Sequence, residues 1–140
     1  PKQLSGGMQQ RTAIARALPI LDTHPGLVAA YLFGSVARGT AKASSDVDIA
    51  VLYAERPPSI LGSPPMKLEG ALERELRCPV QVVCMNTAPP DLGIRVLRGG
   101  RLILERDRAA RIRFEVNLRN VYWDLEPVLK LCRKRETAAR

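Results

Sequence analysis

The chain has 140 residues, of which 46% are hydrophobic and 26% charged, and it carries a formal net charge of +8. This length suits one domain with a single core, and the composition excludes wholesale disorder and collagen-like structure. The basic excess lies at the two ends, since residues 1–18 carry +3, residues 130–140 carry +4 and residues 19–129 only +1. Because a nucleic-acid groove needs clustered cations and stacking rings, we do not expect nucleic acid as the main partner.

Hydrophobic periodicity and turn residues predict an alternation of helices and strands. Short apolar runs bounded by turn residues are typical of strands, whereas apolar residues at every third or fourth position predict helices. In chain order we expect a helix at 4–18, strands at 27–33 and 47–53, a helix at 66–77, a strand at 80–85, a helix at 89–98, a strand at 101–104 and a long helix from 107. This alternation indicates an α/β domain.

Prolines and glycines mark the connections between these elements. Pro19 and Pro25 should bracket the turn after the first helix. Residues 34–45, which are small, polar and punctuated by glycine, should form a loop or a short helix start, and residues 57–65 should form a longer loop. Pro127 should kink or break the last helix.

The predicted last helix carries a stripe of apolar residues: Phe114, Leu118, Val121, Leu125 and Val128. Their spacing places them on one face, which we expect to pack mainly against the domain core. The alternative is that the stripe, with Tyr122 and Trp123 beside it, docks a partner helix. His24, the single histidine, stands before a proline and is expected in a turn without a catalytic role.

No segment of the sequence predicts export or a membrane span. The longest charge-free apolar stretch, residues 25–37, is too short to cross a bilayer, and no signal-peptide pattern opens the chain. The cysteines, Cys78, Cys84 and Cys132, are odd in number and lack zinc-type spacing, which indicates reduced thiols. We therefore expect a cytoplasmic protein with no membrane partner.

The strongest chemical pattern is Gly34-Ser35 followed, after ten residues, by Asp46 and Asp48. Residues two apart on a strand point to the same face, so these carboxylates should lie side by side and repel unless a cation neutralises them. Mg²⁺, which prefers oxygen ligands, is the expected cation. Gly34 allows a phosphate to approach, Ser35 can bind its oxygens and Arg38 adds positive charge. The pattern predicts a metal–triphosphate site, with a solvated turn capped by Asp46 as the alternative.

Residues 30–52, which read AYLFGSVARGTAKASSDVDIAVL, resemble the LFGSxARG…SDxD signature of the minimal nucleotidyltransferases in the DNA polymerase β superfamily. The resemblance extends over roughly residues 24–140. It implies an α/β fold with a small mixed β-sheet flanked by helices, in which the sheet carries the metal-binding aspartates. By this resemblance, the catalytic and Mg²⁺-binding residues are Asp46 and Asp48. The nucleotide-binding residues are Gly34, Ser35, Arg38 and Ser45.

The family also suggests a biological role. Many of its members are antitoxins encoded beside a HEPN-type ribonuclease toxin, and some transfer AMP from ATP to a tyrosine of that toxin. The resemblance therefore implies Mg²⁺-dependent transfer of a nucleotide, with ATP as the substrate and a HEPN-type toxin as the protein partner. In this role the chain would be the antitoxin of the pair.

One position departs from the family's pattern. The family usually carries a third carboxylate on the next core strand, where it completes the metal site and helps to deprotonate the acceptor hydroxyl. The corresponding strand here reads Cys78-Pro-Val-Gln81-Val-Val, and a glutamine cannot act as a base at neutral pH. Glu55 or Glu105 could replace the carboxylate only if the fold brings one of them within reach. A binding-only antitoxin, which keeps the fold but has lost turnover, is the alternative function.

The segment LSGGMQQR, residues 4–11, resembles the signature motif of ABC-transporter ATPases. The chain has no glycine–lysine phosphate loop and no hydrophobic run that ends in Asp-Glu after the signature, so the rest of an ABC site is missing. We therefore expect residues 1–18 to be an appended helix, left by a fusion or a gene-boundary artefact. Residues 19–140 should form the nucleotidyltransferase domain. An ABC-ATPase fragment is the third alternative.

Overall fold

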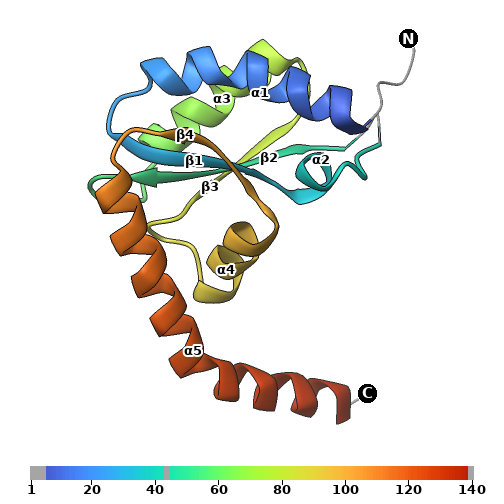
Figure 1. The fold of residues 1–140 in the computed structure, drawn as a ribbon, viewed down its shortest axis with the longest axis vertical. Helices are drawn as coiled ribbons and strands as arrows, with labels where there is room; N and C mark the ends of the chain where they lie inside the picture. The colour runs from blue at the N-terminus through green and yellow to red at the C-terminus, as the bar shows by residue number, and fades with distance from the viewer. Residues whose placement is uncertain (1–5, 43–44, 139–140) are drawn as a thin grey trace.

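Four strands form one mixed sheet in this computed structural model, which describes residues 6–42 and 45–138 (Figure 1). They are β1 (Leu27–Phe33), β2 (Val47–Tyr53), β3 (Val80–Cys84) and β4 (Arg101–Glu105), and their order in the sheet is β3-β2-β1-β4. β1 runs antiparallel to both β2 and β4, whereas β2 and β3 are parallel. The predicted α/β fold with a small mixed sheet is confirmed.

Within the described ranges, five helices accompany the sheet (Figure 1). In chain order they are α1 (Gly6–Thr23), α2 (Gly34–Arg38), α3 (Pro64–Leu76), α4 (Pro90–Gly99) and α5 (Arg108–Ala138). α1 and α3 pack on one face of the sheet, and α4 and the first part of α5 pack on the other. The short helix α2 follows β1 directly. None of these helices is both long and apolar enough to cross a lipid bilayer.

The core has two layers because side chains alternate along each strand. Ile49 and Val51 of β2 are fully buried against α1 and α3, whereas Ala50 and Leu52 are buried in the layer of α4 and α5. Burying one aliphatic side chain contributes roughly 1.5–3 kcal/mol. Burial on both faces explains why the sequence of β2 is a nearly continuous apolar run, with its polar residue, Asp48, near the beginning.

The first helix is longer than the sequence predicted. α1 continues past Pro19 to Thr23, whereas we expected it to end at Leu18; the predicted first residues, 4 and 5, lie outside the described ranges. A proline inside a helix costs about 3 kcal/mol. Ala17 and Leu21 are nonetheless 1% and 0% exposed, and their burial holds the helix on the sheet. The division predicted between residues 18 and 19 therefore falls inside α1.

The C-terminal end of α1 is capped from far along the chain. Arg106, which follows β4, donates hydrogen bonds to the carbonyl oxygens of Leu21 (3.1 Å), Asp22 and His24 (2.8 Å). The last carbonyls of a helix have no partner within the helix, and a cation is favourable there because the helix dipole is negative at this end. This cap stabilises the helix up to Thr23. The turn predicted directly after residue 18 is therefore wrong.

α5 extends beyond the body of the domain. Phe114 and Leu118 pack in the layer of α4, but Val121, Leu125 and Val128 of the same stripe are 38%, 38% and 56% exposed. α5 remains one helix through its internal proline, and Figure 1 shows it bending and running past α4. The stripe is therefore part of the core along the first half of the helix only.

A buried polar network joins α5 to the sheet. The Tyr31 hydroxyl of β1 donates to Glu115 at 2.6 Å, and Arg111 donates to the same carboxylate oxygen at 2.9 Å. Arg111 also donates to Glu105 of β4 at 2.7 Å. Glu115 is only 9% exposed, and a buried charge is tolerated when it is paired and hydrogen-bonded. The network therefore fixes the first turns of α5 against β1 and β4.

Candidate functional site

Gly34 and Asp48 meet at the end of the sheet where β1 finishes and β2 begins. Phe33, the last residue of β1, pairs with Asp48, and the chain turns at Gly34, whose φ is +74°. A Cβ atom on Gly34 would lie 3.0 Å from Cγ of Asp48 and 3.2 Å from its Cβ, and it would be closer still to Oδ2. Glycine is therefore required here by its backbone conformation and by the lack of space.

Asp46 lies close enough to Asp48 to affect its ionisation. Asp46 directly precedes β2 and is exposed, and Asp48 is half-buried within the strand. Burial raises the pKa of Asp48, the negative charge of Asp46 raises it further, and the positive charge of Arg38 lowers it. The negative charge of Asp46 thus disfavours the charged form of Asp48, and a cation beside them would relieve this repulsion.

Gln81 lies beside Asp48 on the neighbouring strand. In the parallel register of β2 and β3 these two residues are partners, so their side chains point to the same face of the sheet. Gln81 is exposed. Among the described residues, no three His, Cys, Asp or Glu side chains converge where they could hold a metal ion. An amide therefore stands beside the aspartate pair at the position where a third carboxylate would complete such a cluster.

Neither Glu55 nor Glu105 lies at this end of the sheet. Glu55 follows Tyr53, the last residue of β2, and Glu105 pairs with Ala29 near the start of β1. A strand rises about 3.3 Å per residue, so both carboxylates lie on the order of 13 Å or more from Asp48 along the sheet. Neither Glu55 nor Glu105 therefore replaces the third carboxylate beside Asp48.

The side chains at this end of the sheet suit Mg²⁺ together with a nucleotide. Mg²⁺ takes oxygen ligands and keeps several waters, and it is usually bound by one or two carboxylates plus the phosphates of a substrate. Asp46 and Asp48 would supply the carboxylates, and the amide oxygen of Gln81 lies on the same face as Asp48. When bound, the ion would neutralise negative charge on the phosphates.

A small hollow of about 140 Å³ lies beside Gly34 and includes a residue that the sequence did not reveal. Gly34 and Arg38 line it from α2, and Arg95 lines it from α4. Ser35, next to Gly34, is half-buried, and its carbonyl oxygen accepts a hydrogen bond from the backbone N–H of Thr40 at 3.0 Å. Arg95 belongs to no motif, and it reaches the hollow because α4 packs beside α2.

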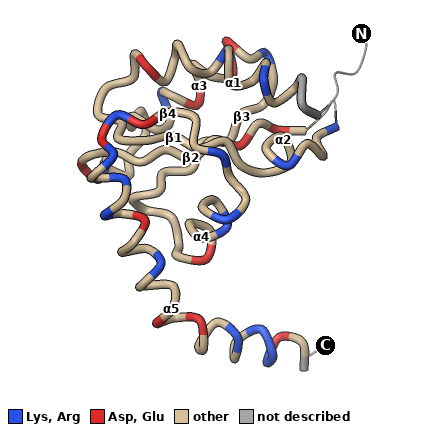
Figure 2. The backbone as a smooth tube through the Cα atoms, in the orientation of Figure 1, with Lys and Arg blue, Asp and Glu red and all other residues tan. Residues whose placement is uncertain are grey.

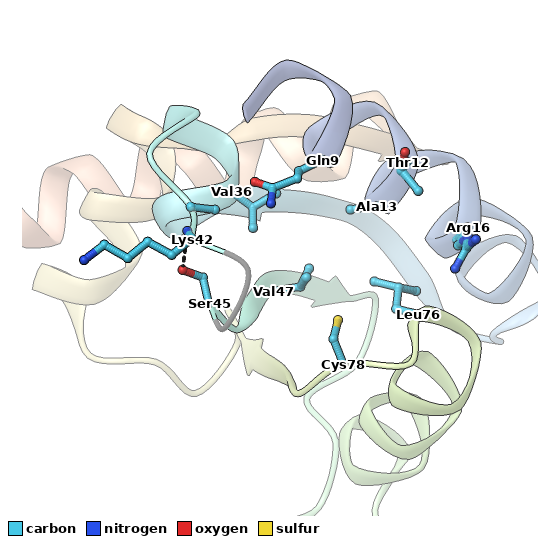
Figure 3. A pocket seen from close by; sticks show the side chains of 11 residues that line it. Gln9, Thr12, Ala13, Arg16, Val36, Lys42, Ser45, Val47, Leu76 and Cys78 are labelled. Carbon is cyan, nitrogen blue, oxygen red and sulfur yellow. Dashed lines mark hydrogen bonds between the residues drawn. The ribbon is translucent and has the colours of Figure 1, made fainter. Parts of the chain in front are cut away.

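Ser45 has different surroundings. Its hydroxyl accepts a hydrogen bond from the backbone N–H of Lys42 at 2.8 Å. It lines a cavity of about 260 Å³ next to α1 (Figure 3), together with Gln9, Arg16, Lys42 and Cys78. This cavity lies on the side of the sheet that α1 covers, whereas the side chain of Asp48 faces the other side. Ser45 is therefore separated from the hollow that Gly34 and Arg38 line.

The family model described as polymerase beta nucleotidyltransferase matches residues 16–109. The chain belongs to this family. The matched range contains all four strands, and with them Gly34, Asp46, Asp48 and Gln81. No curated protein sequence matches this nucleotidyltransferase.

Solved structures with a similar fold include toxin–antitoxin complexes. The nucleotidyltransferase is 26% identical to a chain of a toxin–antitoxin crystal structure with AMP-PNP, with a TM-score of 0.78 over 89% of this chain and 98% of that one. A structure of a tri-AMPylated Shewanella oneidensis HEPN toxin in complex with MNT antitoxin contains a chain of the same fold, 23% identical, with a TM-score of 0.72 over 91% and 98% of the two chains. A proposed minimal nucleotidyltransferase is 31% identical over 72% of this chain and 98% of that one, with a TM-score of 0.56. These similarities confirm the resemblance to the minimal nucleotidyltransferases.

Proposed function

We propose that this nucleotidyltransferase transfers AMP from ATP, with Mg²⁺, to a HEPN-type toxin and acts as the antitoxin of that pair. The observation that carries the proposal is the contact between Gly34 and Asp48. It joins a glycine turn that a phosphate can approach to a carboxylate pair that suits Mg²⁺. The 26% identical chain from the toxin–antitoxin structure with AMP-PNP supports both the nucleotide and the partner. The choice of AMP and of the toxin as acceptor follows from the sequence resemblance.

In the proposed reaction, a hydroxyl oxygen of the acceptor attacks the α-phosphorus of ATP. A new P–O bond forms, the bond from the α-phosphorus to the oxygen that bridges to the β-phosphate breaks, and pyrophosphate leaves. Asp46 and Asp48 would hold Mg²⁺, and Arg38 would add positive charge beside them. The hydroxyl proton leaves to solvent or to a base of the partner, because Gln81 cannot accept it at neutral pH.

Gln81 favours a second candidate function, a binding-only antitoxin. A positioned base typically contributes about 10²–10⁴-fold to the rate of such a reaction. The side chain beside Asp48 is an amide, and Glu55 and Glu105 lie towards the other end of the sheet. A chain without a base could still bind Mg²⁺–ATP and its partner and silence the toxin by contact alone.

Transfer of label from ATP labelled at the α-phosphate to a co-purified HEPN-type toxin tests the proposal. The toxin is taken from the reading frame next to the gene for this chain. The wild type should label the toxin, and Asp48→Asn should not. Asp124→Asn, which removes an exposed carboxylate on α5, should label it like the wild type. A wild type that binds Mg²⁺–ATP and the toxin but transfers no label would favour the binding-only function, and absence of ATP binding would contradict both.

A further inference from the structure

We propose that Arg95 of α4 is a further nucleotide-binding residue, which supplies one of the two cations of the hollow beside Gly34 and binds the terminal phosphates of the nucleotide there. The other cation is Arg38, and the remaining lining residues are Phe33, Leu92 and Gly99. The inference rests on the proposed function and deepens it, because it names a residue that recognises the part of ATP that leaves as pyrophosphate.

The position of the hollow relative to the carboxylates is the first argument. Gly34 belongs to both parts of the site, since its α-carbon faces the Asp48 carboxylate and its backbone lines the hollow. Asp46 lies close enough to Asp48 to affect its ionisation. A nucleotide whose metal is held by these aspartates therefore has its phosphate chain next to the opening of the hollow.

The charge of the hollow is the second argument. Within the described ranges, neither Arg38 nor Arg95 forms an ion pair, so no carboxylate holds either guanidinium group away from an anion. No acidic residue lines the hollow. An anion in this space would therefore lie beside two positive charges. The planar fork of arginine matches the oxygens of a phosphate group, so phosphate is the chemistry that this pair suits.

The size of the hollow is the third argument. Its volume is about 140 Å³. Sites that enclose a whole small-molecule ligand usually measure about 300–1,000 Å³. The hollow therefore has room for phosphate groups and leaves the sugar and the base of the nucleotide outside it.

Arg98, the next arginine along α4, makes a different contact and can serve as a control variant close to Arg95. Arg98 lies over the ring of Tyr122, with its guanidinium carbon 5.3 Å from the ring centroid. It lines another hollow, of about 500 Å³, together with Arg95 and with Arg133 of α5. Figure 2 shows that basic residues occur along α4 and in the last part of α5. Neither Gly34 nor Arg38 reaches that second hollow, so Arg98 has no such connection to the aspartate pair.

Calorimetric titration of the full chain with ATP, AMP and pyrophosphate, each with Mg²⁺, tests this inference. Arg95→Ala should weaken the affinity for ATP and for pyrophosphate by about ten- to a hundredfold, the range expected for one hydrogen-bonded charge pair. The affinity for AMP, which lacks the terminal phosphates, should stay the same. Arg95→Lys should restore part of the loss. Arg98→Ala and Arg113→Ala, which each remove one exposed positive charge elsewhere, should bind all three ligands like the wild type.

Three outcomes would overturn the inference: an unchanged ATP affinity in Arg95→Ala, an equal loss of ATP and AMP affinity, or a wild type that binds neither ATP nor pyrophosphate. A melting curve checks that Arg95→Ala is folded, and Arg95→Lys provides the second test if it is not. The proposed function can fail separately. If ATP binding depends on Arg95 but no AMP is transferred, the proposed transferase function is rejected and the proposed phosphate site stands. If Arg95→Ala binds ATP and transfers AMP like the wild type, the phosphate site is rejected and the transferase function stands.

Discussion

The α-carbon of Gly34 faces the carboxylate of Asp48 so closely that no β-carbon fits between them. The same glycine has a φ of +74°, which other residues adopt only at a cost. The shape of the turn after β1 and the position of the aspartate on β2 are therefore coupled. A change that moves one of these two residues moves the other.

Gly34→Ala should damage both the fold and the site. The left-handed backbone and the displaced Asp48 should together lower the free energy of unfolding by about 1–3 kcal/mol. The affinity for Mg²⁺–ATP should fall about tenfold or more, as expected when one charged ligand is displaced. Urea unfolding and calorimetry measure the two effects.

Gly39→Ala is the matched control for this change. Gly39 has a φ of +73°, but a Cβ atom there would have nothing within 4 Å. The control therefore carries the backbone cost without the clash, and it should keep its affinity for Mg²⁺–ATP. Equal losses of affinity in the two variants would show that contact with Asp48 does not matter for binding.

Gln81→Asp should make stability depend on Mg²⁺. The new carboxylate would lie beside Asp48 on the same face of the sheet, where three negative charges repel one another. The melting temperature should fall below that of the wild type in chelator and rise more steeply when Mg²⁺ is added. If the missing base limits turnover, AMP transfer should increase by up to about 10²–10⁴-fold.

Gln81→Asn serves as the neutral control, because asparagine matches aspartate in size without the charge. It should show the Mg²⁺ response of the wild type in melting curves. A loss of melting temperature in Gln81→Asp that is the same with and without Mg²⁺ would contradict a shared metal site.

Tyr31→Phe should loosen the attachment of α5. The change removes the hydroxyl that donates to the buried Glu115 at 2.6 Å and keeps the ring. Hydrogen bonds to charged groups contribute about 1.5–3 kcal/mol, and urea unfolding should show a loss of this size. Tyr122→Phe is the control, since that ring is also buried but has no carboxylate partner among the described residues. Similar losses in both variants would mean that packing alone explains the effect.

His24 should reduce stability in acid. Its Nε2 atom is 2.8 Å from the hydroxyl of Tyr53, and burial, together with the positive charge of Arg106, lowers the pKa of His24 below 6.5. The unfolded chain then binds a proton at a pH where the folded chain does not, so the free energy of unfolding decreases as the pH falls through 6.5 towards the lowered pKa. Melting temperatures of the wild type and His24→Gln, compared above and below this pH, should show the smaller drop in the variant. Equal drops would assign the acid sensitivity to other groups.

Local patterns were sufficient for the strands that carry Gly34 and Asp48. The predicted strands at 27–33 and 47–53 coincide with β1 and β2, because strands buried on both faces leave a clear apolar run in the sequence. The sequence also predicted the strand that carries Gln81, but its alignment with Asp48 came only from the resemblance to the family. That alignment depends on a parallel pairing across α3, which local patterns do not determine.

Contacts between distant segments decided the features that the sequence did not predict. Arg106 and the burial of Leu21 carry α1 past Pro19, and both effects arise only when the sheet is assembled. Arg95 reaches the hollow through the packing of α4 beside α2. The apolar stripe of α5 has one spacing throughout, so the periodicity could not show that Val121, Leu125 and Val128 would be exposed.

The capping of α1 by Arg106 also bears on the order in which the chain folds. The guanidinium group and the carbonyl oxygens that it contacts are 82 to 85 residues apart in sequence. Closing so long a loop costs chain entropy before any of its contacts form. The last turn of α1 therefore gains its cap only after β4 has joined β1, although α1 comes first in the chain. Hydrogen exchange at the end of α1 thus reports on the opening of the edge strand β4.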